Sequence, residues 1–164
     1  MKKIMTLIAV LFFVAAIQAQ TLQSLFDKYG NDERFEYVSV GKGMMNMASA
    51  FGGMVKNDKE LISKMTGIKI LTLNQNSDSP LMKSVTRDLN QIVEKGNFET
   101  AVEAREKGEN VHIYYRVMGN DNADLLIVTK EKDEFSVIWI SGKMSKEEMM
   151  KTFSATGEKL KSLG

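Results

Sequence analysis

The sequence predicts an α+β domain in which an antiparallel sheet, made of a C-terminal four-strand meander plus N-terminal strands, is covered on one face by helices. Three observations support this fold class. Apolar and polar residues alternate in four consecutive segments from residue 98 onward, apolar residues recur at helical spacing in several earlier segments, and turn-forming residues separate the segments. The 164-residue chain is 43% hydrophobic with one proline, a composition typical of a single globular domain.

Residues 1–19 have the three-part layout of a secretory signal peptide. Lys2 and Lys3 precede a short apolar run that closes on small residues, and we expect cleavage after Ala19. The run is shorter than the ~18 apolar residues of a membrane-spanning helix. We therefore expect residues 20–164 to form one mature domain that is periplasmic or secreted, with no stable membrane anchor.

Charge and cysteine content narrow the class of function. The chain carries 22 basic and 21 acidic residues, and loss of Lys2 and Lys3 leaves the mature protein nearly neutral. Binding to nucleic acid would need a basic excess to neutralise phosphates, so we expect no nucleic-acid partner. The chain has no cysteine, which excludes disulfides and a lipidated cysteine at the cleavage site. Stability must therefore come from packing.

The N-terminal half predicts alternating helices and strands. Thr21 caps a short helix with one apolar stripe, and Gly30 ends it. The elements expected after it are a strand at 35–41, a methionine-rich helix at 43–55, a short helix that begins at Asp58 and stops at Gly67, and a strand at 68–74. This last strand is apolar on both faces, which indicates a central position in the sheet.

The clearest predicted helix covers residues 80–95, because Ser79 supplies a capping hydroxyl and Pro80 suits the first helical position. After Gly96 the hydrophobic period changes to two. The expected strands are 98–105, 111–118, 124–131 and 135–142. Residues 98–105 also contain good helix formers, so strand and helix both stay open for that segment.

A further helix is predicted at 145–161, after Gly142 ends the last strand. Ser145 and Glu148 form a capping box, and Met144 can contact Met149 across the first turn. We expect this helix and the helix at 80–95 to cover the same face of the sheet.

His112 is the only histidine and the first candidate for chemistry. It alternates with Tyr114 and Arg116, which predicts that this face of the strand is polar and exposed to water. Catalysis would need a nucleophile or an acid–base partner, and the sequence has neither a cysteine nor the elbow motif of serine hydrolases. A zinc site lacks ligands as well. We therefore interpret His112 as a surface residue and predict no catalytic residues.

Two motifs resemble ligand-binding loops but lack a required residue. GKGMMN, residues 41–46, lies between a strand and a helix as a phosphate loop would, yet the third glycine and the Lys-Ser pair are missing. Four residues reproduce the spacing of a calcium loop: Asn120, Asn122, Asp124 and Glu131. Leu125 stands where that loop requires glycine. Ordinary turns explain both motifs, so we expect no metal and no cofactor.

The methionine content, 12 residues in all, is the one unusual feature of the composition. Met44, Met47, Phe51 and Met54 are predicted to lie on one side of the weak helix at 43–55. Filling of the core is the simplest interpretation. A flexible groove for an apolar ligand and a Cu(I) site are alternatives, because thioethers adapt to apolar shapes and bind soft metals.

Four segments carry a resemblance to a known family: EYVSVGKGMMNM, GIKIL, VHIYYRV and, above all, VIWISGKMSKEEM. With these segments the chain resembles the bacterial envelope family catalogued as domain of unknown function 4252. The resemblance implies a secreted or lipid-anchored protein of Gram-negative bacteria with no established activity. Some relatives carry an anchor cysteine, which this chain lacks.

We therefore expect a non-enzymatic binding or interaction module of the cell envelope. Its surface would be the open sheet face around His112, Tyr114 and Arg116 or the methionine-rich helix, and its partner an envelope protein or an apolar small ligand. One alternative is a carrier of a lipid or other apolar molecule in a cavity lined by Met44, Met47, Phe51 and Met54. A second is an enzyme of unrecognised type, in which His112, Arg116 and carboxylates converge.

Processing of the leader can be tested directly. The exported protein should begin at Gln20, because the small residue Ala19 closes the apolar run. N-terminal sequencing and intact mass measurement of the protein from the envelope fraction check this. A mature protein that still carries Lys2 and Lys3 would contradict the prediction.

Overall fold

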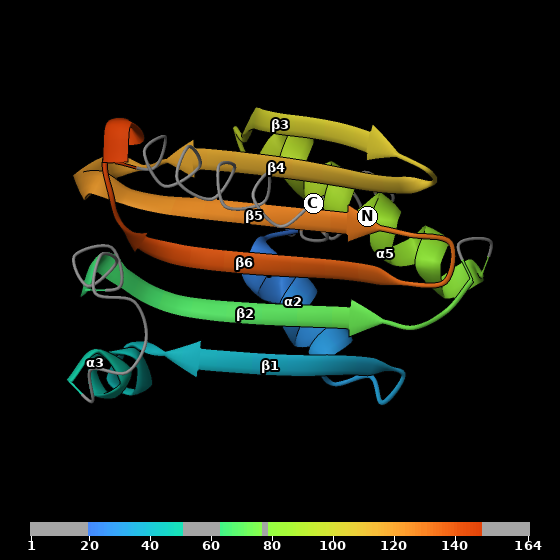
Figure 1. The fold of residues 1–164 in the computed structure, drawn as a ribbon, viewed down its shortest axis with the longest axis horizontal. Coiled ribbons are helices and arrows are strands. Elements are labelled where there is room, and N and C mark those ends of the chain that lie inside the picture. Colours follow the sequence, from blue (N-terminus) through green and yellow to red (C-terminus); the bar gives the residue numbers. More distant parts are fainter. Residues whose placement is uncertain (1–19, 51–62, 77–78, 149–164) are drawn as a thin grey trace, which may run out of the picture.

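The computed structural model describes residues 20–50, 63–76 and 79–148, which form a six-stranded antiparallel sheet with two helices on one face (Figure 1). The described helices are α2 (Leu22–Gly30), α3 (Lys42–Ala50), α5 (Pro80–Lys95) and the short 3-10 helix η2 (Gly119–Asp121). The strands are β1 (Phe35–Gly41), β2 (Met65–Leu73), β3 (Glu99–Glu106), β4 (Glu109–Val117), β5 (Asn122–Lys130) and β6 (Phe135–Lys143). The predicted α+β class is confirmed, and residues 98–105 are a strand rather than a helix.

The helices begin where their capping residues predict. Thr21 Oγ1 accepts a hydrogen bond of 3.1 Å from the backbone N–H of Ser24, and Ser24 Oγ accepts one of 2.8 Å from the N–H of Thr21. Ser79 Oγ accepts from the N–H of Met82 at 3.1 Å. Gly96 caps the end of α5, where its N–H donates to the carbonyl oxygen of Ile92 at 2.8 Å, and a Cβ at this position would lie only 2.5 Å from that oxygen.

The strand order is β1-β2-β6-β5-β4-β3. The C-terminal strands form the expected meander, and β2 inserts the N-terminal hairpin beside β6 at the centre of the sheet (Figure 1). The central position predicted for this strand is confirmed. Its start is not, because β2 begins at Met65, where we expected the end of a helix that Gly67 would stop. Met65 pairs with Gly142 of β6, and a register shift between Met65 and Gly67 accommodates the glycine.

The main core lies between the sheet and the helices α2 and α5. Leu71, Leu126 and Val137 project from three neighbouring strands and are fully buried against Phe26 of α2 and Leu89 of α5. The ring of Phe26 lies 5.6 Å from Trp139 and 6.3 Å from Tyr37, between centroids. Helix α2 therefore covers the N-terminal half of the sheet and α5 the C-terminal half.

The helix predicted at 145–161 begins as expected. The N–H of Glu148 donates to Ser145 Oγ at 3.3 Å, and Glu148 Oε2 accepts from the N–H of Ser145 at 2.9 Å. The rest of this helix, with Met149, lies outside the described residues, as does the helix start at Asp58. Helix α2 shares its face of the sheet with α5. The predicted covering of this face by 145–161 rests on residues outside the described part of the chain and stays a prediction.

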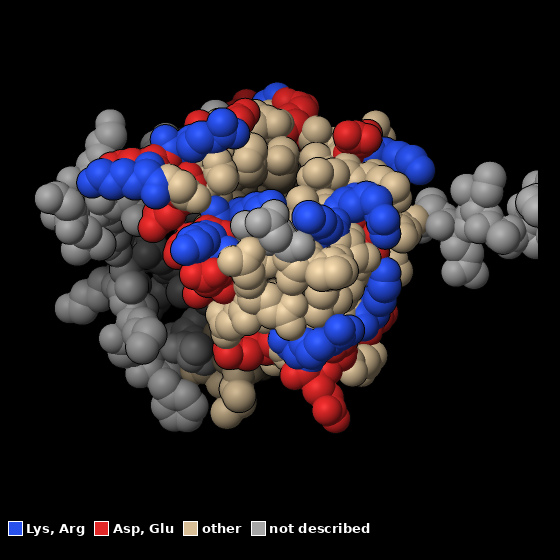
Figure 2. All heavy atoms as spheres, turned by 90° about the vertical axis from the view of Figure 1, so that its right-hand side faces the viewer, with Lys and Arg blue, Asp and Glu red and all other residues tan. Residues whose placement is uncertain are grey.

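Charged side chains do not separate by sign at the end of the sheet where the β3–β4 and β5–β6 hairpins turn. Basic and acidic residues are interleaved on this face of the molecule (Figure 2). The distribution agrees with the nearly equal numbers of basic and acidic residues, 22 and 21. This end presents no extended field of one sign.

Candidate functional site

The residues Arg116, Asp124 and Trp139 form a buried polar cluster under the helices. Arg116 on β4 stands opposite Asp124 on β5 in register, and its Nε and a terminal nitrogen lie 2.8 and 2.7 Å from Asp124 Oδ2. Trp139 Nε1 on β6 donates to Asp124 Oδ1 at 2.8 Å. Both oxygens of this buried carboxylate are thus occupied.

Arg116 also ties the sheet to the end of α5. Its guanidinium lies 4.5 Å from the centroid of the Phe98 ring and donates to the carbonyl oxygen of Gly96 at 3.3 Å. Only 22% of the Arg116 side chain is exposed. These contacts link β4, β5 and β6 to one another and to the C-terminal end of α5, which is a structural role.

The predicted open, polar face around Tyr114 and Arg116 is wrong. Both residues lie on the face that α2 and α5 cover, and Tyr114 packs against the main core. Burial, with a smaller contribution from the charge of Glu103, raises the pKa of Tyr114 above its ordinary value. The alternation places Tyr114 and Arg116 on one face as expected, but the long apolar parts of tyrosine and arginine can pack against a core while their polar ends stay hydrogen-bonded or hydrated.

His112 lies on the same face, two residues before Tyr114. The two rings are stacked, with centroids 5.8 Å apart and planes 4° from parallel. The convergence of His112, Arg116 and carboxylates that an enzyme would require is not formed, because Arg116 and Asp124 lie beyond Tyr114 along the strands. In the described part of the chain, no three His, Asp or Glu side chains are placed to hold a metal ion.

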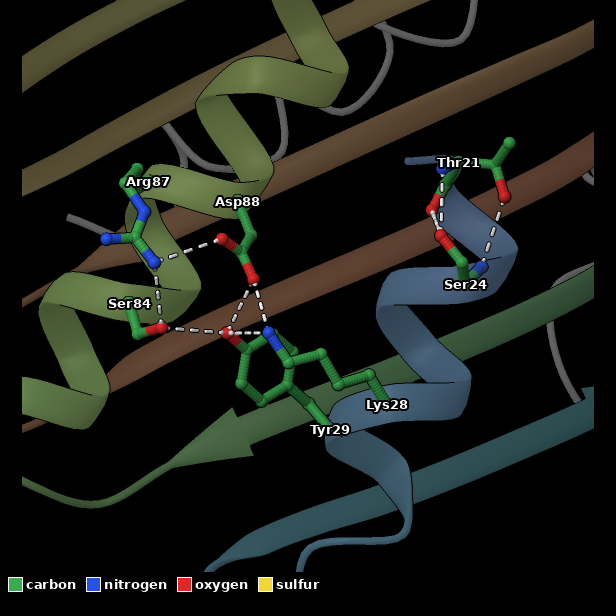
Figure 3. Close-up of polar contacts among 7 residues, drawn as sticks. All are labelled: Thr21, Ser24, Lys28, Tyr29, Ser84, Arg87 and Asp88. Carbon is green, nitrogen blue, oxygen red and sulfur yellow. Dashed lines mark hydrogen bonds and ion pairs between the residues drawn. The ribbon is translucent and has the colours of Figure 1, made fainter. Parts of the chain in front are cut away.

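A second polar cluster joins α2 to α5 (Figure 3). Lys28 Nζ donates to Asp88 Oδ2 at 2.7 Å, and the hydroxyl of Tyr29 lies 2.8 Å from the same oxygen. Ser84 and Arg87 complete the group, with an Arg87 nitrogen 3.6 Å from Asp88 Oδ1. Sequence reasoning missed this cluster, although Asp88 falls at the inward spacing of α5 among otherwise apolar residues, which signals a buried carboxylate in need of a partner.

Burial alone would raise the pKa of Asp88, but the hydrogen bonds from Lys28 and Tyr29 outweigh it and hold that pKa below its ordinary value of 3.8. The hydrogen bond to Asp88, followed by that to Tyr29, raises the pKa of Lys28 above 10.5. Both shifts favour the ion pair. Every member of the cluster is bonded to another member. The cluster therefore acts as a hydrogen-bonded link between α2 and α5.

The methionines of α3 are not core residues as a group. Met44 is 65% exposed and Met47 55% exposed, whereas Met45 is buried. Filling of the core, the simplest interpretation of these methionines, is therefore wrong for Met44 and Met47. Helix α3 begins at Lys42, directly after β1, and contacts both β1 and β2. Phe51 and Met54 lie outside the described residues, so the methionine-lined cavity stays a prediction.

A surface hollow of about 370 Å³ lies along the outer side of α5. Its lining is polar and includes Lys83, Thr86, Asn90 and Lys130. None of the predicted site residues contributes to it. The Oγ1 of Thr86 is buried there and is the one buried side-chain oxygen or nitrogen without a hydrogen-bond partner among the residues described.

The two loop-like motifs are ordinary turns. Gly41 ends β1 and α3 begins at the next residue, which confirms a strand-to-helix turn. Asn120 has a positive φ of 62° in the β4–β5 turn, a conformation that asparagine tolerates. Asp124 lies near the start of β5 and Glu131 follows its end, so the residues with calcium-loop spacing do not surround one point.

The sheet face turned away from α2 and α5 carries one line of apolar residues that crosses all six strands, beside a more polar line that includes Glu36, Thr72, Ser136 and Thr129. One β-branched residue from each strand stands in register with the next: Val38, Ile70, Ile138, Ile127, Ile113 and Val102. We call these six residues the aliphatic row. Its four central members are partly exposed, and Val38 and Val102 at the two edges are 50% and 39% exposed. Neither α2 nor α5 lies over this face (Figure 1).

A second buried cluster closes one end of this face. Tyr115, Leu125 and Met144 pack together beside the aliphatic row, with Ile140 partly buried against them. The hydroxyl of Tyr115 donates to Glu99, which also accepts from Lys146 Nζ at 3.1 Å. These contacts hold the segment after β6 against the edge of the sheet.

These features define a small α+β domain with hydrogen-bonded polar clusters on its helical side and an aliphatic row on the other. The family of this chain follows from comparison with known proteins. The chain belongs to the family described as domain of unknown function (DUF4252), whose model matches residues 29–152. No curated protein and no solved structure matched the chain. Among the residues described here, no helix has the length and apolar character needed to cross a membrane.

Replacing Arg116 tests the structural role of its ion pair with Asp124. Arg116→Met should lower the free energy of unfolding by about 3 kcal/mol, because Asp124 would stay buried without its cationic partner. Urea denaturation followed by Trp139 fluorescence measures the change. The matched control is Arg105→Met on β3, an exposed arginine that bonds Asn110 at 2.6 Å and should cost less than about 0.5 kcal/mol. Equal effects of the two variants would contradict a structural role specific to Arg116.

The stabilisation that the Lys28–Tyr29–Asp88 cluster provides should depend on pH. Because the pKa of Asp88 is lower in the folded protein than in the unfolded chain, its stabilisation is present above about pH 4 and is lost as the pH falls through the folded pKa. Asp88→Asn should therefore cost about 1–2 kcal/mol at pH 7 and much less near pH 3. Urea midpoints at both pH values check this, with the exposed Asp27→Asn as control. A cost that does not change with pH would show that packing, rather than charge, is lost.

Proposed function

We propose that this protein is an exported, non-enzymatic interaction module of the cell envelope, and that its partner binds on the aliphatic row. The observation that carries the proposal is the register of Val38, Ile70, Ile138, Ile127, Ile113 and Val102 across the sheet. Apolar surface of this extent favours association with another apolar surface. Export is supported by the leader at residues 1–19.

The polar clusters support a role in binding over one in catalysis. The buried carboxylates Asp88 and Asp124 are engaged by Lys28 and Tyr29 and by Arg116 and Trp139. A catalytic acid or base needs a lone pair or proton available to a substrate, and these carboxylates use theirs to hold helices and strands together.

The chemistry of the face favours an amphipathic helix of an envelope protein as the partner. The aliphatic row supplies the apolar surface. The charged residues that border it on β1 and at the β3–β4 hairpin are Glu36, Glu106, Glu109 and one basic residue, Lys107, which lies 3.9 Å from Glu106, so this border is acidic on balance. A helix with an apolar stripe and basic flanks complements both features. A free lipid could pack on the aliphatic row, but the acidic border would add nothing to its binding energy.

Site-specific photocrosslinking in the native envelope tests this proposal. A photoreactive amino acid at Ile138, in the centre of the row, should give one discrete adduct with another protein, and the same group at Gln91 on the outer side of α5 should not. Ile127→Lys, which places a charge beside Ile138, should reduce the adduct at least tenfold while circular dichroism stays that of a folded protein.

Mass spectrometry of the adduct decides the outcome. An adduct that maps to a helical segment of a second protein supports the proposal. An adduct within the chain's own residues 149–164, an equal yield from Gln91, or no adduct would each overturn it, because the row would then be covered from within or have no partner.

A further inference from the structure

The sheet is open and has two edge strands, β1 and β3. The outer side of an edge strand carries backbone N–H and C=O groups that can pair with another chain, and proteins usually block such edges with charges, bulges or prolines. The two edges of this sheet differ in that respect.

The β3 edge is protected. Its register with β4 shifts between Thr100 and Val102, which marks a bulge. Half of its residues are charged: Glu99, Glu103, Arg105 and Glu106. A strand approaching this edge would meet an irregular ladder and several charges.

The β1 edge lacks these features. Its sequence FEYVSVG contains one charged residue, Glu36, which accepts a hydrogen bond of 3.1 Å from Asn74 beside β2. The pairing with β2 is continuous from Phe35 opposite Leu73 to Gly41 opposite Gly67, without a register shift. The outer side of β1 is therefore a regular template for another strand.

Exposed apolar side chains gather at the same edge. Of the seven large hydrophobic residues exposed in the described part of the chain, four lie on β1 and α3: Tyr37, Val38, Met44 and Met47. Surface of this kind beside an unprotected strand is typical of a site that another chain covers.

The sequence of β1 is also complementary to itself. In an antiparallel pair centred on Val38, Val38 faces Val38 of a second copy, Tyr37 faces Ser39 and Glu36 faces Val40. No like charges oppose each other, and residues that face each other lie on the same side of the combined sheet. The aliphatic row of one copy would then continue directly into that of the other.

We propose that two copies of this protein associate through antiparallel pairing of their β1 strands, forming one continuous twelve-stranded sheet. The interface is isologous, so it closes on itself and leaves β3 as the protected edge at both ends. This proposal concerns the edge of the sheet and does not depend on a partner binding to the aliphatic row.

Engineered cysteines test the geometry, because the chain contains no cysteine of its own. Facing residues of an antiparallel pair have Cα atoms about 4.5–5.5 Å apart, within the range of a disulfide. The mature protein with Val38→Cys should form a disulfide-linked dimer on mild oxidation. Val102→Cys, at the other end of the aliphatic row, is the matched control and should stay at least tenfold less linked.

Charge substitutions test the association in solution by light scattering coupled to size exclusion. The mature protein should have the mass of a dimer, Val38→Lys and Val38→Glu should each be monomers, and Val102→Lys should remain a dimer. An equimolar mixture of the Val38→Lys and Val38→Glu proteins should regain the dimer mass, which shows that the monomers are folded. A monomeric parent protein, equal disulfide yields at residues 38 and 102, or no recovery in the mixture would overturn the proposal.

Discussion

The pairing of β2 with β6 is the constraint on which the rest of the structure depends. It joins the N-terminal hairpin to the C-terminal meander over the span from Leu73 opposite Phe135 to Met65 opposite Gly142. Helix α2 can pack on the sheet only when this pairing is in place, because Phe26 contacts both Tyr37 of the N-terminal hairpin and Trp139 of the C-terminal meander. Closing such distant segments is costly in chain entropy, so the buried residues at the seam, Leu71 and Val137, must offset that cost.

The two polar clusters add specificity to this apolar core. A carboxylate buried under a helix is stable only in the arrangement that supplies its partners, so Asp124 favours the register in which Arg116 and Trp139 reach it. Asp88 does the same for the crossing of α2 and α5 through Lys28 and Tyr29. The helical side of the sheet is thus fixed by hydrogen bonds as well as by packing.

Local signals in the sequence predicted most of the elements, and contacts between distant residues account for what they missed. The hydroxyls of Thr21 and Ser79 placed two helix starts, and the period-two pattern after Gly96 placed the meander. The insertion of β2 beside β6 could not be predicted, because pairing of distant strands leaves no local pattern. The covered face was misassigned since Tyr114 and Arg116 are classified as polar although most of each side chain is apolar.

The candidate site was predicted less well than the fold. The aliphatic row exists only once the strand order and the register are known, because its six members come from separate segments. Asp88 was visible in the sequence as a carboxylate at a buried helix position, but nothing nearby identified Lys28 and Tyr29 as its partners. The methionine pattern misled because Met44 and Met47 are exposed, whereas Met45, which the pattern left out, is the buried one.

The unequal exposure of the described methionines determines which of them an oxidant would reach first. With no thiols present, thioethers are the groups most open to peroxide, and Met44 and Met47 are far more accessible than the buried Met45, Met82 and Met144. Among the described methionines, sulfoxide formation would therefore begin with Met44 and Met47 on α3, followed by Met118, which is 41% exposed, and would turn these apolar side chains polar while leaving the interior intact. Redox damage to this molecule would change its surface before it changed its fold.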